Sequence, residues 1–460
     1  MIKFKKMIFV FLVFLCSLIL IGCKEENECE HDWDSGKITV EATCTEAGIR
    51  TFTCLKCGST KEEAIAALDH SYIEEVIAAT CTEDGKIVTK CERCGKIKST
   101  KTTDKATGHH FKIVVDVESV DGSIGKKHKE CEDCKMAEAQ YSYVNNGYSR
   151  YGKLHVNGAD LVDENNNKVQ LMGLSTHGLH WYGEYVNEVS LQACKEAFNI
   201  NVYRFSLYTS EKGYCECSNE KKEELYQLIL NGVKIATKLD MYAIVDWHML
   251  GEENANDKDP NYYKEQAKEF FDRITKDLID YDNVLYEIMN EPNGRNVTWD
   301  NHCKPYAEEI IPIIRANKPD AIILVGNPDC SSNLTGPKRN PLSFANIMYT
   351  YHFYAGDEDM QSTSDVTKAY TAGLPIFISE HGGMDADGNG AIDVESINRW
   401  YKALDARNIS YVAWNISHKK ESSGILKSKT ANLDDFSNSN LKEWGIFYKN
   451  HVRSRLGLTD

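Results

Sequence analysis

Residues 284–294 read V-L-Y-E-I-M-N-E-P-N-G, a short apolar run that ends in two polar residues, Asn290 and Glu291. Stretches with the 3.6-residue periodicity of amphipathic helices precede and follow it, at 262–281 and 302–317. A short buried strand between two helices is the repeating unit of a parallel sheet covered by helices. The run therefore predicts one strand of an α/β fold, with Glu291 at its carboxyl end.

The same alternation continues through residues 152–460. Apolar runs that predict strands lie at 169–175, 201–207, 242–248, 284–291, 322–326, 348–353, 376–380 and 411–415. Further helical stretches lie at 221–239, 394–407 and 441–455. Before the first strand, two short segments flank Asn157-Gly158, which predicts a β-hairpin. Eight strands that alternate with helices predict a (β/α)8 TIM barrel, in the α/β class.

Composition limits what the chain binds. It has 460 residues, 42% of them hydrophobic, and a formal net charge of −16 at pH 7. This length predicts more than one domain. The negative charge argues against a nucleic-acid partner, because phosphate binding needs a basic surface. The sequence has no glycine-rich phosphate loop, which argues against phosphoryl transfer.

Residues 1–22 predict an export signal, because Lys3, Lys5 and Lys6 precede an apolar run at 8–21. The run ends in L-I-G-C at 20–23, which resembles a bacterial lipobox. We therefore expect a lipid anchor at Cys23 and an extracellular, cell-surface location, associated with the membrane only through that anchor. A plain cleaved signal is the alternative.

Residues 23–134 predict a small Cys/His-rich repeat module, since nine of the 16 cysteines lie between Cys29 and Cys134. Two copies share T-C-T-E, a glycine and C-x-x-C. The predicted ligand sets are His31, Cys44, Cys54 and Cys57 in the first copy, and His70, Cys81, Cys91 and Cys94 in the second. A degraded third copy keeps His109 or His110 and Cys131-x-x-Cys134.

Three thiolates and one imidazole form a closed ligand set for structural zinc. Each copy is too small to bury a core, so a metal would supply the missing cross-link. An exported protein also favours disulfides, but three cysteines per copy is an odd number and a disulfide gives the repeated histidine no role. We therefore favour zinc over disulfides. Residues 135–151 are polar and predict a linker to the catalytic domain at 152–460.

Polar residues gather where the predicted barrel strands end, which is where TIM barrels build their active sites. Strand alternation places Glu287, Met289 and Glu291 on one face. Glu287 is expected to belong to a buried polar layer or to pair with Arg204, and not to act as a third catalytic acid. Two carboxylates, Glu291 and Glu380, end two different strands. Acetal hydrolysis needs two such groups, one to protonate the leaving oxygen and one to meet the oxocarbenium-like centre. A metal hydrolase that uses His177, His248 and His352 is the alternative.

Seven ordered motifs carry a resemblance to a known family. They are L-M-G-L-S-T-H-G-L-H-W-Y, V-Y-R-F-S-L-Y-T, A-I-V-D-W-H, V-L-Y-E-I-M-N-E-P-N-G, Y-H-F-Y, P-I-F-I-S-E-H-G and W-N-I-S-H-K-K-E-S-S. In this order they resemble glycoside hydrolase family 5, and they look like its bacterial endoglucanases. The resemblance covers nearly all of residues 152–460. It implies a retaining endo-β-1,4-glucanase that cleaves internal linkages of cellulose and related β-glucans by double displacement, with no cofactor for catalysis.

The resemblance also implies roles for individual residues. Glu291 in N-E-P is the acid/base and Glu380 in I-S-E-H is the nucleophile, about 5–5.5 Å apart as in retaining enzymes. Catalytic support is expected from Arg204, Asn290, His352 and Tyr354. Arg204 would keep Glu380 ionised, because a neighbouring guanidinium favours the charged carboxylate. His381 departs from the pattern, since relatives usually carry an aromatic residue there, so the floor of that subsite is expected to differ.

Substrate binding is expected from residues that offer either a flat ring or a hydrogen-bonding group. They are His177, Trp181, Tyr182, Tyr208, His248, Tyr354, Trp414, Lys419 and Glu421. Aromatic rings suit a polysaccharide because sugars present apolar C–H faces. The same mechanism on mannan or xylan is one alternative. A non-catalytic cell-surface carbohydrate-binding protein is the other.

Overall fold

A computed structural model of the chain describes residues 29–250, 258–357 and 362–458. The predicted signal and lipobox at 1–23 lie outside the described residues. The described residues form two units. The first runs from residue 29 to Phe111 and includes Cys131–Met136, and the second comprises Lys112–Glu130 and the chain from Ala137 onward. Within the described ranges, no helix has the length and apolar character needed to cross a membrane.

The first unit contains two small antiparallel sheets of three strands each. Their strands are β1 (Lys37–Val40), β2 (Gly48–Thr53) and β3 (Thr60–Ile65), then β4 (Tyr72–Ile77), β5 (Lys86–Cys91) and β6 (Ile97–Thr102). Within residues 29–111, four of the five buried apolar side chains are cysteines, Cys44, Cys54, Cys81 and Cys91, and the fifth is Val88. These sheets therefore have almost no hydrophobic core.

A third small sheet contains β7 (Phe111–Val117), β8 (Ile124–Cys131) and β9 (Tyr141–Val144). Strand β9 and helix α1 (Tyr148–Tyr151) lie in the stretch predicted as a linker. The Asn199 side chain bonds both the N–H and the C=O of Val144, each at 3.0 Å. Asn146, 2% exposed, donates to the C=O of Asn199. Residues 141–151, predicted as part of a linker, therefore form a strand and a helix, and Val144 and Asn146 bond to Asn199 of the barrel domain.

The second unit contains a closed parallel barrel of eight strands, each paired with the next and the last with the first. The strands are β12 (Met172–Thr176), β13 (Val202–Tyr208), β14 (Tyr242–His248), β15 (Val284–Glu287), β16 (Ile322–Val325), β17 (Ile347–Tyr354), β18 (Ile376–Gly382) and β19 (Tyr411–Ile416). Every residue of these strands is buried. The (β/α)8 prediction is confirmed.

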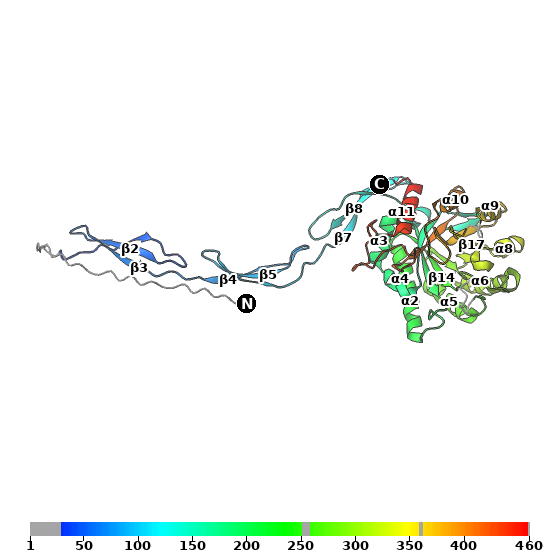
Figure 1. The fold of residues 1–460 in the computed structure, drawn as a ribbon, viewed down its shortest axis with the longest axis horizontal. Coiled ribbons are helices and arrows are strands. Elements are labelled where there is room, and N and C mark those ends of the chain that lie inside the picture. The colour runs from blue at the N-terminus through cyan, green and yellow to red at the C-terminus, as the bar shows by residue number, and fades with distance from the viewer. Residues whose placement is uncertain (1–28, 251–257, 358–361, 459–460) are drawn as a thin grey trace, which may run out of the picture. The chain divides into compact units, whose positions relative to one another are not determined.

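Helices lie around the barrel strands (Figure 1). The longer ones are α3 (Glu188–Phe198), α4 (Asn219–Lys238), α5 (Lys264–Asp277), α6 (Lys304–Asn317), α9 (Thr363–Thr371), α10 (Val394–Asp405) and α11 (Glu443–Arg455). Short ones are α2 (Leu179–Tyr182), α7 (Pro328–Ser331) and α8 (Thr335–Arg339), with a 3₁₀ turn at Gly183–Tyr185 and a π turn at Trp299–Cys303. Side-chain caps fix where some of these helices begin. Ser218 accepts a hydrogen bond from the N–H of Lys221 at the start of α4, and Asp393 accepts one from the N–H of Ser396 at the start of α10.

The amino end of the barrel is closed by the predicted hairpin, β10 (His155–Asn157) and β11 (Asp160–Val162). Leu154 and Leu161 pack with Ile244, Leu324 and Val412 of the barrel strands in one buried cluster. Because this end is filled with apolar side chains, the polar groups at the carboxyl ends of the strands are the ones available for chemistry.

Candidate active site

Arg204 on β13 lies at the centre of the site and has no solvent-exposed surface. Its guanidinium meets three carboxylates: Nε is 2.7 Å from Glu287, Nη1 is 3.0 Å from Glu380 and Nη2 is 3.0 Å from Asp246. Burial opposes the charge on Arg204, but attraction from these carboxylates outweighs it and raises the pKa of the guanidinium. Burial likewise opposes ionisation of Glu287, yet Arg204 lowers the pKa of Glu287 to about 2. The predicted pairing of Arg204 with Glu287 is confirmed.

Glu380 is held by a donor on each carboxylate oxygen. Tyr354 Oη donates to Oε1 at 2.8 Å and Arg204 Nη1 donates to Oε2 at 3.0 Å. One oxygen of Glu380 and one of Glu291 lie within 4.8 Å of each other. This separation fits the roughly 5–5.5 Å of retaining carboxylate pairs and is shorter than the roughly 6.5–9.5 Å of inverting pairs.

His352 on β17 joins Glu291 to the buried charges. Its Nδ1 lies 2.8 Å from Oε1 of Glu291, and its Nε2 lies 2.9 Å from Oγ of Ser379. Ser379 donates its own proton to Glu287 at 2.7 Å, so Nε2 of His352 carries a hydrogen and donates to Ser379. Burial would lower the pKa of His352, but the carboxylates of Glu287 and Glu291 outweigh burial and raise it to about 9.

His248 on β14 differs from His352 in its protonation. Its Nδ1 lies 2.6 Å from Oδ2 of Asp246, to which it donates. Burial, reinforced by Arg204, lowers the pKa of His248 to about 3, so the ring is neutral. Asn290 accepts from Arg204 at 2.6 Å through its oxygen, while its Nδ2 donates to the C=O of Met249 and faces Nε2 of His248 at 3.4 Å.

A cavity of about 290 Å³ opens over the two glutamates, and one wall of it is aromatic. The rings of Tyr208 and His248 stack at 4.3 Å, and those of His248 and Trp414 at 5.2 Å with an angle of 9° between their planes. Trp181 meets the Tyr208 ring edge-on at 5.3 Å and is 45% exposed. Flat rings held in this way offer stacking surfaces to a sugar.

Most of the predicted site residues lie together. Those lining the cavity are His177, Tyr208, His248, Glu291, His352, Tyr354, Glu380, Trp414, Lys419 and Glu421. Lys419 and Glu421 form an ion pair at 2.6 Å. Trp181 and Tyr182 lie beside the cavity, with their rings 5.7 and 5.0 Å from that of His177. Arg204 and Asn290 lie beneath it and act on the cavity through their hydrogen bonds.

Two sequence expectations about the site are corrected. The fourth strand ends at Glu287, so alternation does not extend to Glu291, and Asn290 rather than Met289 reaches Arg204. His381 does not form a subsite floor, because its ring is fully buried and bonds to the C=O of Val412 and to Tyr401. Among the described residues, His352 groups with Glu291 and Glu380 and not with His177 and His248, so the three histidines of the metal-hydrolase alternative do not converge on one site.

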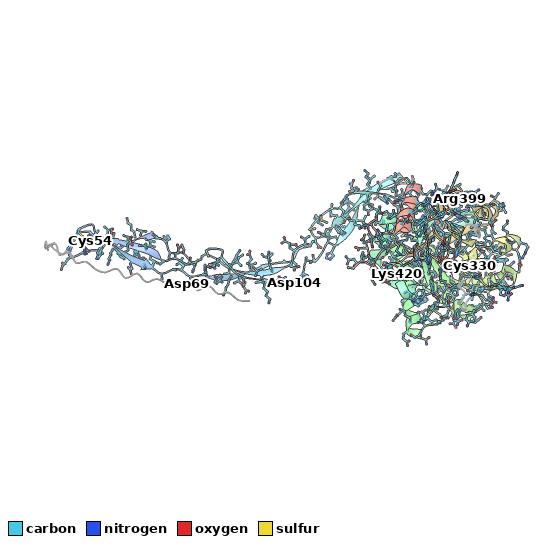
Figure 2. All side chains as sticks on the ribbon, viewed as in Figure 1. Cys54, Asp69, Asp104, Cys330, Arg399 and Lys420 are labelled. Atoms are coloured by element: carbon cyan, nitrogen blue, oxygen red, sulfur yellow. The ribbon has the colours of Figure 1, made fainter. Side chains whose placement is uncertain are left out.

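Several participants were missed from the sequence. Ser379 bridges His352 and Glu287, and Leu250, Cys330 and Asp387 line the cavity. Cys330, labelled in Figure 2, follows β16. In the pairing of β17 with β18, Thr350 pairs with Phe377 and His352 with Glu380, so one residue of β17 lies opposite two of β18 between these pairs. This extra residue in β18 brings Ser379 and Glu380 to the same site, which strict alternation does not predict.

The Cys/His residues of the first unit form three groups that could hold a metal ion. They are Cys29, His31, Cys54 and Cys57; Cys44, His70, Cys91 and Cys94; and Cys81, His109, Cys131 and Cys134. The predicted sets were therefore wrong in one member each, since Cys44 and Cys81 lie with the following copy. The physical reason is strand number: with three strands per sheet, the T-C-T-E turn and the C-x-x-C turn lie at opposite ends.

Comparison with known proteins agrees with this geometry. The family model for cellulase, glycosyl hydrolase family 5, matches residues 162–420. Endoglucanase A of Butyrivibrio fibrisolvens is 43% identical over 295 residues, which cover 64% of this chain and 67% of that protein. Endoglucanase A of Evansella cellulosilytica is 41% identical, with 62% of this chain and 56% of that protein covered.

Solved structures give the same result. The catalytic domain of Thermobifida fusca endoglucanase Cel5A, in complex with cellotetraose, matches with a TM-score of 0.61 and 34% identity. The match covers 66% of this chain and 99% of that one. The chain therefore belongs to glycosyl hydrolase family 5 and is a glycoside hydrolase.

Proposed function

We propose that the barrel is a retaining endo-β-1,4-glucanase in which Glu380 is the nucleophile and Glu291 the acid/base. The observation that carries this proposal is the approach of the two carboxylates to within 4.8 Å, with Arg204 bound to only one of them. The carboxylate whose two oxygens are held by Arg204 and Tyr354 is suited to nucleophilic attack. The other, 19% exposed at the cavity, is suited to exchange protons with substrate and water.

In the first step, an oxygen of Glu380 attacks the anomeric carbon while Glu291 protonates the departing glycosidic oxygen. The bond from carbon to the leaving sugar breaks and a glycosyl ester to Glu380 forms. Negative charge leaves Glu380 during attack, and the donors Tyr354 and Arg204 hold its two oxygens in place beforehand. In the second step, Glu291 takes a proton from water, which attacks the same carbon and releases the sugar with its original configuration.

His352 supplies Glu291 with its proton. Because Nε2 of His352 is committed to Ser379, the hydrogen bond from Nδ1 to Oε1 of Glu291 holds one titrating proton. Either atom can carry that proton, so it can pass to the leaving oxygen through Glu291. The raised pKa of His352, about 9, keeps this proton bound at neutral pH.

The substrate proposed is cellulose or a related β-glucan chain. Trp414 and Tyr208 in the cavity and the half-exposed Trp181 beside it can stack on successive sugar rings. The relatives named above are endoglucanases, and one of them was solved with cellotetraose. Stacking recognises ring faces more than single hydroxyl configurations, so mannan and xylan are the comparison substrates.

Two variants distinguish the roles. Glu291→Gln should lose about 10²–10⁴-fold on carboxymethylcellulose, but much less in the bond-breaking step of an aryl cellobioside whose leaving group needs no proton. Glu380→Gln should be inactive on both substrates, because no nucleophile remains. Glu265→Gln, at an exposed position of α5 away from the cavity, serves as a control that keeps activity. Near-normal turnover by either glutamine variant on cellulose would refute its assigned role.

We also propose that the protein is exported and lipid-anchored at Cys23, and that the first unit holds structural zinc. The apolar run and the L-I-G-C motif support the anchor, and the three Cys/His groups support the metal. Mass spectrometry of the protein purified from its membrane fraction should find fatty acids on Cys23, and an unmodified Cys23 would contradict the anchor.

A further inference from the structure

The Cys/His residues of the first unit divide completely into four-ligand groups. Between residues 29 and 134 the chain has nine cysteines. With His31, His70 and His109 they make three sets of three sulfurs and one imidazole, and none of these cysteines is left over. The other two histidines of the stretch bond carboxylates instead, His110 to Asp133 and His128 to Asp116, each at 2.8 Å.

The spacing within each set fits a tetrahedral metal. The sulfur pairs Cys29–Cys54, Cys44–Cys91 and Cys81–Cys131 are 4.0, 3.7 and 3.8 Å apart. Zinc–sulfur bonds of about 2.3 Å place two sulfurs of a tetrahedron about 3.8 Å apart, whereas a disulfide requires about 2.05 Å. In each set Nδ1 of the histidine lies 3.2–3.4 Å from another cysteine sulfur, close to a tetrahedral nitrogen–sulfur edge.

The topology explains why the second and third sets draw on two repeats. A three-stranded antiparallel sheet enters at one end and leaves at the other, so the turn after its first strand lies beside the start of the next repeat. Cys44 is in the turn between β1 and β2, and Cys81 is in the corresponding turn between β4 and β5. Each lies with the histidine and the C-x-x-C pair of the repeat that follows.

The ligands available at the first and last of the three repeats differ from those of the middle repeat. No T-C-T-E sequence lies before His31, and Cys29, two residues before His31, occupies the position that Cys44 and Cys81 fill in the second and third sets. In the third sheet, residues 118–123 between β7 and β8 contain no cysteine, so no ligand is offered to a further repeat. Cys54, the partner of Cys29, is labelled in Figure 2 at the end of β2.

We infer that the first unit is an array of three zinc sites in which the second and third metals each join consecutive repeats, while Cys29 completes the first site as a terminal cap. This inference rests on the proposed zinc role and adds the stoichiometry and the pairing of ligands. Because the sheets lack an apolar core, the metals hold each repeat to the next.

The test is a zinc count on the full-length chain, purified under reducing conditions and equilibrated with a competing chelator. The wild type should hold three equivalents. Cys44→Ser with Cys91→Ser should lose one, because both changes fall in one site, whereas Cys44→Ser with Cys54→Ser should lose two. Cys29→Ser alone should lose one. Cys217→Ser, in the barrel domain, is the matched control and should keep three.

The outcomes separate the two claims. A wild type without bound zinc would refute the zinc role itself. The sharing between repeats would be refuted, and zinc kept, by a different set of counts. The wild type would then hold two equivalents and Cys29→Ser would lose none. Cys44→Ser with Cys91→Ser would lose two, and Cys44→Ser with Cys54→Ser would lose one. Hydrolysis of carboxymethylcellulose by every variant verifies that the barrel is folded, so a lost metal cannot be mistaken for a misfolded chain.

Discussion

Strand β13 of the barrel buries all seven of its residues, whereas β6 of the first unit exposes all six. Each fully buried aliphatic side chain in the barrel contributes about 1.5–3 kcal/mol to stability, so the barrel holds its fold by apolar burial. The first unit has almost no such burial outside its cysteines. The comparison teaches that one chain can combine a fold maintained by its core with one maintained by cross-links between ligands.

The largest expected effect follows from removing the metal. A strong chelator under reducing conditions should unfold the first unit completely and leave hydrolysis of soluble carboxymethylcellulose unchanged, because none of the residues lining the cavity belongs to that unit. Amide hydrogen exchange measured by mass spectrometry reports the two units separately. Protection of amides from exchange that persisted in residues 37–102 after complete metal removal would show that the first unit does not depend on metal for its fold.

The next effect concerns the polar centre of the barrel. Arg204→Met leaves Asp246, Glu287 and Glu380 buried without their shared cation. We expect a loss of about 3–5 kcal/mol in the free energy of unfolding, together with loss of activity. Denaturant unfolding followed by tryptophan fluorescence measures the first. Arg273→Met, at a surface pair with Glu223, is the control and should cost less than about 1 kcal/mol.

The smallest effect concerns pH. The pKa of His352 is raised to about 9 from an ordinary value near 6.5. Its contribution to stability is therefore complete below pH 6.5 and is lost as the pH rises through about 9. Activity should fall over the same upper range, as the proton shared with Glu291 is lost. His352→Gln should move this alkaline limit to lower pH, because the group whose raised pKa sets the limit is then absent.

The control for this prediction is the neutral histidine of the same site. His248→Gln should leave the position of the alkaline limit unchanged, since the pKa of His248 lies near 3 and its ring does not titrate there. An alkaline limit that stayed in place in His352→Gln would show that the proton is held elsewhere.

The barrel could be predicted from the sequence because its signals are local. The run at 242–248 matches β14 residue for residue, and Glu291 and Glu380 both follow apolar runs at the expected end of the barrel. The prediction of which residues lie in the site was wrong where the backbone departs from regular strand geometry. The early end of β15 and the extra residue of β18 bring Asn290 and Ser379 inward, and no apolar pattern reports either.

The Cys/His-rich module shows a different limit of prediction from sequence. Sequence repeats identified the ligand types but not their grouping, because the unit that repeats in the sequence is not the unit that binds. Cys44 lies 47 residues from Cys91, and only the number of strands between them brings the two sulfurs to 3.7 Å. The linker prediction for residues 141–151 missed contacts of a related kind, since Val144 and Asn146 bond to Asn199, which lies 55 and 53 residues further along the chain.

The most direct test of the central claim is to trap the glycosyl-enzyme. A 2-fluoro cellobioside with a good leaving group should form an ester that accumulates, because the fluorine slows both steps and the leaving group restores the first. Peptide mass spectrometry should then find the added disaccharide on Glu380 alone. An adduct on Glu287 or Glu291, or hydrolysis that releases the inverted anomer without any adduct, would contradict the account.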